Sequence, residues 1–238
     1  SLSTFSDLDP LETEPTVKLR WVAPGEELGK PDAVVIPGSK QTLRDLAAIH
    51  NNGLGKALCS YAANGGHIFG ICGGMQMLGD ELCDPEGLEG GTPAGHSSQE
   101  GLGLLPVQTV FSADKALQQR SSVAQWPEGR SALKLEGFEL HHGRTTGPES
   151  CQALCLDADL GWVNPIGEQG GLVAGTYLHG VFESGPWRRR WLNQLRGRKG
   201  LAPLSEQQPH HSRQRDALLD RLADAFEQHI NLKPLLAS

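Results

Sequence analysis

Short apolar runs and helical repeats alternate along the first 80 residues of the chain. The runs at 33–36 (AVVI) and 67–71 (HIFGI) are β-branched or apolar and end at Pro, Gly or acidic residues, which predicts strands. The predicted strands are 17–22, 33–36 and 67–71, and the predicted helices are 42–50, 54–63 and one that starts at 75–78. This alternation is typical of a parallel sheet with helices on both faces.

The pattern changes after residue 84. Residues 84–100 are rich in Gly, Pro and Ser and predict a surface excursion. The remaining predicted strands are 102–111, 137–142, 153–156 and 172–178, and a helix at 185–195 has Pro186 in its first turn.

The C-terminal part predicts a linker at 200–214 and a helix at 216–230. Four apolar residues follow one another at four-residue spacing, so we expect one apolar face that docks on the body: Leu218, Leu222, Phe226 and Ile230. A length of 238 residues fits one large domain, and we take 1–238 as a single domain. The chain begins without Met in a loop-like segment, so we expect it to be a piece of a longer protein.

Composition narrows the classes of partner. The net charge is −7 and basic residues form no long block, which argues against nucleic acid. No run approaches the ~18 apolar residues of a membrane span, and no secretory signal is present, so we expect a soluble, cytoplasmic protein. Five cysteines without a C-x-x-C pair predict neither a disulfide framework nor a metal site.

The strongest chemical signal is GICGGMQMLG at 70–79, between a predicted strand and a predicted helix. Gly70 and Gly74 lie two residues either side of Cys72, which permits the sharp turn that exposes a nucleophile. The helix dipole would lower the pKa of the thiol, and free N–H groups could hold an oxyanion. The alternative is a core cysteine beside a tight turn; we interpret Cys72 as a nucleophile.

A thiolate nucleophile needs a base, and the chain has nine histidines. His179 ends an apolar strand at a glycine, which is where a parallel sheet presents catalytic side chains. The alternative is an ordinary edge histidine. Two weaker segments are Gly38 in PGSK, where a backbone can approach a ligand, and GFELHHGRT at 137–145, which also fits a solvated edge strand or adventitious metal binding.

Five segments in this order resemble the class I glutamine amidotransferase domain of the cobyric acid synthase family of the cobalamin pathway. They are PGSKQTLRDL, GICGGMQMLG, GLGLLPV, GFELHHGRT and GTYLHGVFE, and the opening residues resemble the start of that domain. The resemblance implies an α/β, three-layer, flavodoxin-like fold with a mostly parallel central sheet.

The resemblance also assigns roles. Cys72 would attack the side-chain amide of glutamine, giving a thioester and ammonia, with His179 as base and then acid. The N–H groups of Gly38 and Gly73 would form the oxyanion hole, and Gln76 would contact the bound glutamine.

One position departs from the wider class, in which a Glu two residues after the histidine orients it. Here that position is Val181, as in the cobalamin-related branch, and Glu183 or Glu139 could substitute. Without this carboxylate we expect a slow glutaminase that depends on its partner.

Members of the family resemble a two-domain protein with an N-terminal ATP-binding synthetase of P-loop type. This chain contains no G-x-x-x-x-G-K-[ST] motif, so we expect ATP, Mg²⁺ and the corrinoid to bind in that missing synthetase domain, with no cofactor in this fragment. The ammonia would pass to the b, d, e and g carboxylates of adenosylcobyrinic acid a,c-diamide.

Four alternatives remain. The chain could belong to cobyrinic acid a,c-diamide synthase or to a lipid-precursor amidotransferase, although PGSKQT and DLDPLE favour the first assignment. It could also be a non-catalytic docking domain of the same fold, or a cysteine peptidase.

Overall fold

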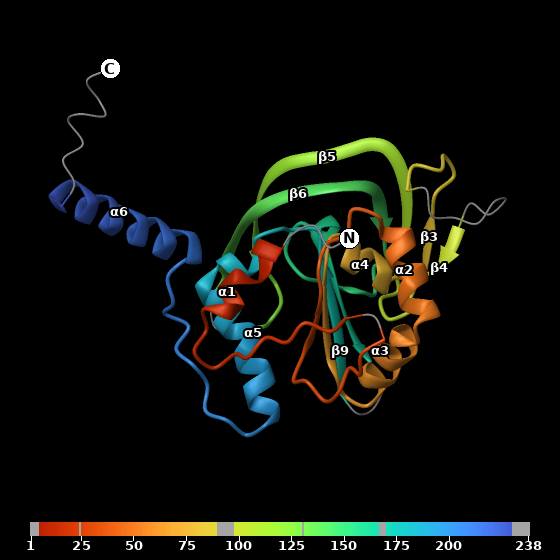
Figure 1. Cartoon of the computed structure of the whole chain (residues 1–238). Coiled ribbons are helices and arrows are strands. Elements are labelled where there is room, and N and C mark those ends of the chain that lie inside the picture. The colour runs from red at the N-terminus through yellow and green to blue at the C-terminus, as the bar shows by residue number, and fades with distance from the viewer. Residues whose placement is uncertain (1–4, 24, 90–97, 130, 167–169, 230–238) are drawn as a thin grey trace, which may run out of the picture.

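A computed structural model describes residues 5–23, 25–89, 98–129, 131–166 and 170–229. A five-stranded sheet in the order β1-β2-β9-β8-β7 forms the middle layer (Figure 1). Its strands are β1 (Val34–Ile36), β2 (His67–Ile71), β7 (Gln152–Ala153), β8 (Gly161–Ile166) and β9 (Gly171–Thr176). β1, β2 and β9 pair in parallel, whereas β8 is antiparallel to both β9 and β7. The three-layer α/β prediction is confirmed, but the sheet is more mixed than expected.

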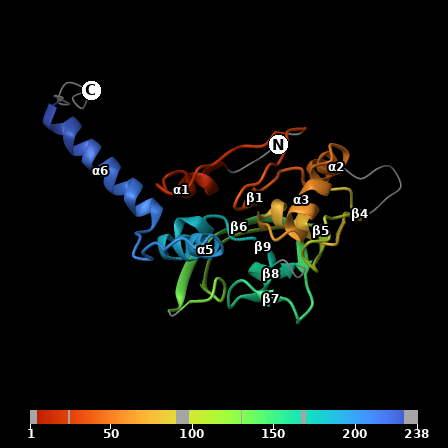
Figure 2. The ribbon, with the colours of Figure 1, turned by 90° about the horizontal axis from the view of Figure 1, so that it is seen from below.

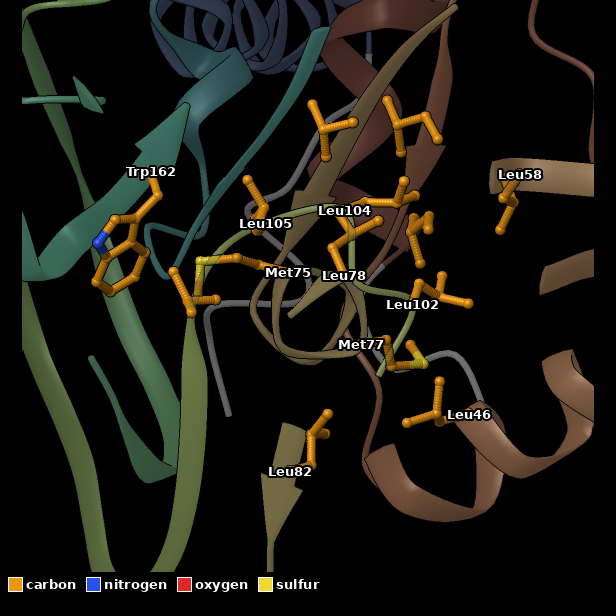
Figure 3. Close-up of a cluster of buried hydrophobic side chains, with 14 of the residues drawn as sticks. Leu46, Leu58, Met75, Met77, Leu78, Leu82, Leu102, Leu104, Leu105 and Trp162 are labelled. Carbon is orange, nitrogen blue, oxygen red and sulfur yellow. The ribbon is translucent and has the colours of Figure 1, made fainter. Parts of the chain in front are cut away.

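The buried strands have two apolar faces, and each face has its own helices. Ile68 packs with α2 (Thr42–Asn51), α3 (Leu54–Ala63) and α4 (Gly73–Leu78), whose core side chains include Leu46, Leu58 and Leu78 (Figure 3). The next residue, Phe69, points to the opposite face and packs with Trp187 and Trp191 of α5 (Gly185–Arg198). Consecutive side chains of a strand face opposite sides of the sheet, so the run HIFGI is typical of a strand that is buried on both sides.

The N-terminal segment covers part of the α5 side. It contains η1 (Phe5–Leu8) and α1 (Asp9–Glu12), and Leu8 and Leu11 are buried in the same cluster as Phe69. Two further short 3-10 helices are η2 (Ala158–Leu160) and η3 (Val181–Glu183).

A second sheet, in the order β4-β3-β5-β6, lies beside the first. Its strands are β3 (Glu81–Cys83), β4 (Ser98–Glu100), β5 (Gln108–Ala124) and β6 (Leu133–Thr146). β5 and β6 form a long antiparallel ribbon that arches over the central sheet (Figure 1). The ribbon is the element that covers the carboxyl ends of β2 and β9.

Several predicted strands differ from the structure. Residues 17–22 are not in a strand; together with residues of β1 they line a cavity of about 440 Å³. Residues 102–107 make turns against α4, so β5 begins only at Gln108. β8 and the polar middle of β5 were not predicted, because neither shows a clean alternation of apolar and polar residues.

The C-terminal helix α6 (His211–His229) begins five residues earlier than expected, so the linker ends at residue 210. It projects away from the body (Figures 1 and 2). Leu218, Leu222 and Phe226 are about half exposed, so the prediction that this face docks on the body is wrong. Ile230, the last residue of the predicted helix, lies outside the described residues. Within the described part of the chain, no helix combines the length and apolar character needed to cross a membrane.

Candidate active site

Cys72 lies at the turn between β2 and α4, at the carboxyl edge of the central sheet. Its φ is 51°, a left-handed value that no other described non-glycine residue adopts. The turn is fixed from both sides, because the Cys72 N–H donates to the carbonyl oxygen of Thr176 at 2.8 Å and its own carbonyl accepts from the N–H of Gln76 at 3.0 Å. Strain of this kind at a cysteine is typical of a nucleophile held in a fixed direction.

The flanking glycines are required by close packing. A Cβ on Gly70 would lie 2.6 Å from the backbone of Met75, and a Cβ on Gly74 would lie 2.1 Å from the carbonyl oxygen of Ile36. Both distances are far below any real contact, so no side chain fits at either position. The elbow predicted from the sequence is confirmed.

The loop after β1 lies against the same turn. A Cβ on Gly73 would meet the backbone nitrogen of Ser39 at 3.0 Å and the Oγ1 of Thr42 at the same distance, and Gly38 itself is buried. Gly38 and Gly73 therefore belong to adjacent backbone segments beside Cys72, as an oxyanion hole would need.

His179 follows β9 and is 2% exposed. Its ring stacks on that of Phe138 with centroids 5.0 Å apart, and its Nδ1 lies 2.8 Å from Oδ2 of Asp7. Burial of the ring favours the neutral form. Hydrogen bonds to Asp7 and Cys72, together with the negative charges of both partners, outweigh burial and raise the pKa of His179 to about 9. The nucleophile and base predicted from the sequence are thus brought together.

Asp7 is the residue that sequence reasoning missed. Its side chain is buried, and its second oxygen, Oδ1, accepts from the N–H of Gly180 at 2.9 Å. The two acids expected to replace the missing carboxylate have other partners: Glu183 faces His210 at 3.7 Å, and Glu139 accepts from Gln118 and Arg120. Among these carboxylates, Asp7 is the one hydrogen-bonded to the His179 ring.

β6 covers the site, and the carbonyl groups of alternate β6 residues accept hydrogen bonds from it. The carbonyl oxygen of Phe138 accepts from the N–H of His179 at 2.9 Å, and that of Leu140 accepts from Sγ of Cys72 at 3.4 Å. The carbonyl oxygen of His142 accepts from Nε2 of Gln76 at 3.1 Å. Cys72 is only 6% exposed, so little of its side chain is open to solvent.

Gln76 is 2% exposed, and its side chain hydrogen-bonds to three neighbours in the site. Besides its bond to β6, its Nε2 donates to the hydroxyl of Tyr177 at 3.0 Å, and its Oε1 accepts from Oγ1 of Thr42 at 3.5 Å. Burial raises the pKa of Tyr177, whose ring stacks on that of His141 at 3.6 Å. Gln76 therefore connects β6, Tyr177 and α2 next to Cys72.

The two adjacent histidines of β6 face different neighbours. The Nδ1 of His141 lies 3.1 Å from the carbonyl oxygen of Gly143, and its Nε2 lies 3.6 Å from a carboxylate oxygen of Glu139. Burial lowers the pKa of His141. His142 instead lies near enough to Glu89 for an electrostatic interaction between the two side chains. Across the described ranges, no three His, Cys, Asp or Glu side chains gather as ligands for a metal ion.

Comparison with known proteins gives a consistent picture. The family model of the CobB/CobQ-like glutamine amidotransferase domain matches residues 1–187. A cobyric acid synthase of Synechococcus sp. (strain CC9311) is 80% identical over 241 residues, which cover 100% of this chain and 47% of that protein. Another, from Synechococcus sp. (strain WH7803), is 68% identical over 237 residues, which cover 99% and 48%. The chain spans about half the length of these curated relatives.

A solved structure described as a glutamine amidotransferase has the same fold. It matches with a TM-score of 0.58 and 16% identity over 82% of this chain and 95% of that chain. This likeness confirms the flavodoxin-like glutamine amidotransferase fold expected from the sequence. The family model runs from the segment that carries Asp7, through the elbow at Cys72 and past His179, to the first turn of α5. The chain belongs to the family of CobB/CobQ-like glutamine amidotransferase domains.

Proposed function

We propose that this chain is the glutaminase domain of a cobyric acid synthase. The observation that carries the proposal is the pair formed by Cys72, in the strained turn, and His179, whose pKa is raised to about 9. At neutral pH this pKa makes His179 an imidazolium beside the sulfur, which stabilises a thiolate. High identity to curated cobyric acid synthases over the whole chain supports the choice of parent protein.

The reaction follows from this pair. The sulfur of Cys72 attacks the side-chain carbonyl carbon of glutamine, and a C–S bond forms as the carbonyl oxygen becomes an oxyanion. We assign the stabilisation of that oxyanion to the N–H groups of Gly38 and Gly73; the close approach of the loop after β1 to Gly73 supports this assignment. The imidazolium of His179 gives its proton to the amide nitrogen, the C–N bond breaks, and ammonia leaves. Neutral His179 then takes a proton from water, whose oxygen attacks the thioester, and glutamate and the thiolate are released.

Glu89 is a candidate for holding the α-ammonium group of the substrate. Its Oε2 accepts from the N–H of Thr42 at 2.7 Å, and the hydroxyl of Thr42 reaches Gln76 beside the nucleophile. Burial raises the pKa of Glu89, so its carboxylate would gain from an incoming positive charge. Glu89→Gln should raise KM for glutamine more than it lowers kcat, with the exposed Glu86→Gln as control.

The synthetase half belongs to the part of the parent protein outside this chain. This placement is supported by the relatives, which are about twice as long. ATP, Mg²⁺ and the corrinoid would bind there, and the ammonia made at Cys72 would amidate the b, d, e and g carboxylates of adenosylcobyrinic acid a,c-diamide. A cytoplasmic location suits an enzyme that consumes glutamine and ATP.

The test is covalent trapping with a diazo-ketone analogue of glutamine, followed by intact mass and peptide mapping. It requires only a thiolate and a glutamine pocket, so it does not depend on the synthetase half. We expect one adduct on Cys72, protection by excess glutamine, and no adduct in Cys72→Ser; Cys59→Ser is the matched control. Labelling spread over several cysteines, or none, would favour a non-catalytic docking domain. In the parent, Cys72→Ser should abolish glutamine-dependent amidation and leave ammonia-dependent amidation intact.

A further inference from the structure

The carboxylate of Asp7 is held between the ring of His179 and the backbone of the following residue. Oδ2 lies 2.8 Å from Nδ1 of His179, and Oδ1 accepts from the N–H of Gly180 at 2.9 Å. A carboxylate only accepts hydrogen bonds, so Nδ1 must carry a proton. The other ring nitrogen, Nε2, is therefore the one that exchanges a proton with Cys72.

The position that carries an acid in the wider class has no charge here. Val181 begins η3, is 1% exposed and packs in the apolar cluster of α5. Asp7 approaches the imidazole from a different element, the N-terminal segment, which is 172 positions away in the sequence. His179 therefore has a carboxylate partner, although position 181 does not provide one.

We propose that Asp7 is the positioning residue of the glutaminase reaction: it fixes the orientation and tautomer of His179 and stabilises the imidazolium. This inference rests on the proposed glutaminase function. Residues 5–14 act as a strap that carries Asp7 to the site. Asp7 then takes the place of the carboxylate that is missing at Val181, and the site has a Cys–His–Asp arrangement.

The strap is attached at a second point, which keeps Asp7 in place. Glu14 is 2% exposed, and its two oxygens each lie 2.8 Å from an Nε, one of Arg188 and one of Arg189. Between the two attachments, Pro10 and Leu11 are buried. Asp7 is thus held by the apolar packing of α1 and by the ion pairs of Glu14 that follow it, as a positioning group must be.

The test compares Asp7→Asn with wild type in the full 238-residue chain. The side-chain amide of Asn has one accepting oxygen and an NH2 group that only donates, so it cannot replace both of the oxygens with which Asp7 contacts His179 and Gly180. We expect kcat for glutamine hydrolysis to fall about 10²- to 10⁴-fold with KM nearly unchanged, as for loss of an orienting acid. In wild type, the rate of Cys72 trapping should fall on the alkaline side of its pH profile near pH 9, where His179 loses its proton. In Asp7→Asn this alkaline limb should move to lower pH, because the imidazolium loses its counter-charge.

Two control variants separate positioning from a structural role. Asp9→Asn removes the same charge from an exposed position on the same strap, and Glu183→Gln removes the acid nearest the expected place; neither should change kcat or the pH limb. If Asp7→Asn fails to fold by circular dichroism, Asp7→Glu carries the test. This variant keeps the negative charge, so the alkaline limb of its trapping profile should stay near pH 9. An alkaline limb near the ordinary pKa of histidine would overturn the proposal.

The outcomes distinguish this inference from the proposed function. If wild type is trapped at Cys72 and a folded Asp7→Asn has the same kcat and pH limb, Asp7 has no positioning role and the glutaminase assignment stands. If wild type is not trapped at Cys72, the glutaminase assignment fails, and the role of Asp7 fails with it.

Discussion

The backbones of Phe138 and His179 hold each other through two hydrogen bonds. The N–H of Phe138 donates to the carbonyl oxygen of His179 at 3.2 Å, and the N–H of His179 donates to that of Phe138 at 2.9 Å. This short bridge joins β6 of the second sheet to the loop that carries the base. The position of the base therefore depends on how closely β6 can approach.

Gly137 permits that approach, so Gly137→Ala should impair catalysis. A Cβ there would lie 2.1 Å from the carbonyl oxygen of His179, and β6 would have to move away. We expect a loss of about 1–3 kcal/mol in the free energy of unfolding and a clear drop in the rate of Cys72 trapping. Gly197→Ala is the matched control, because nothing lies within 4 Å of its Cβ. Equal trapping rates in the two variants would contradict the prediction.

Glu14→Gln should destabilise the protein strongly. Arg188 is 0% exposed and would be left in the interior without its full counter-charge. Breaking a buried ion pair from one side costs about 3–5 kcal/mol, which urea denaturation can measure. Glu12→Gln, at an exposed position two residues away, should change the free energy of unfolding by at most about 0.5 kcal/mol. A small effect at Glu14 would mean that the strap is held by apolar packing alone.

His67 should make the protein acid-sensitive. Burial, aided by the positive charge of Arg198, lowers its pKa to about 4. The unfolded chain takes up this proton near pH 6.5, whereas the folded chain does so only near pH 4. The free energy of unfolding should therefore fall as the pH drops through this window, by on the order of 3 kcal/mol from this group.

The measurement for His67 is a series of thermal melts between pH 7 and pH 4 for wild type and His67→Gln. The variant should lose less stability over this range than wild type, because glutamine does not titrate. Parallel curves for the two proteins would show that His67 is protonated in the folded state at its ordinary pKa.

The exposed face of α6 should contribute little to stability in this chain. Leu222 is 48% exposed, whereas Leu192 of α5 is 6% exposed, so the two leucines form a matched pair. We expect Leu192→Ala to cost about 2–5 kcal/mol and Leu222→Ala about 0.5 kcal/mol or less. Differential scanning calorimetry compares them directly. A large loss for Leu222→Ala would mean that the helix docks in solution, as its spacing predicts.

A structural feature could be predicted from the sequence where the residues that determine it are close together in the chain. The elbow at Cys72 could be predicted because the turn needs glycines at fixed short distances, and β2 because it is a short, mainly apolar run. Asp7 could not, since its contact with His179 arises from tertiary packing of distant segments. The spacing in α6 shows which face is apolar but contains no information on what covers it.

β6 supplies carbonyl groups to the base, the nucleophile and Gln76 from positions 138, 140 and 142. Alternate residues of a strand share one edge, so a slip of a single residue would turn all three groups away at once. An insertion or deletion anywhere between Leu133 and Phe138 would act on the three together. A change in the length of this strand is therefore expected either to keep all three contacts with the site or to remove all three, because they cannot be adjusted one at a time.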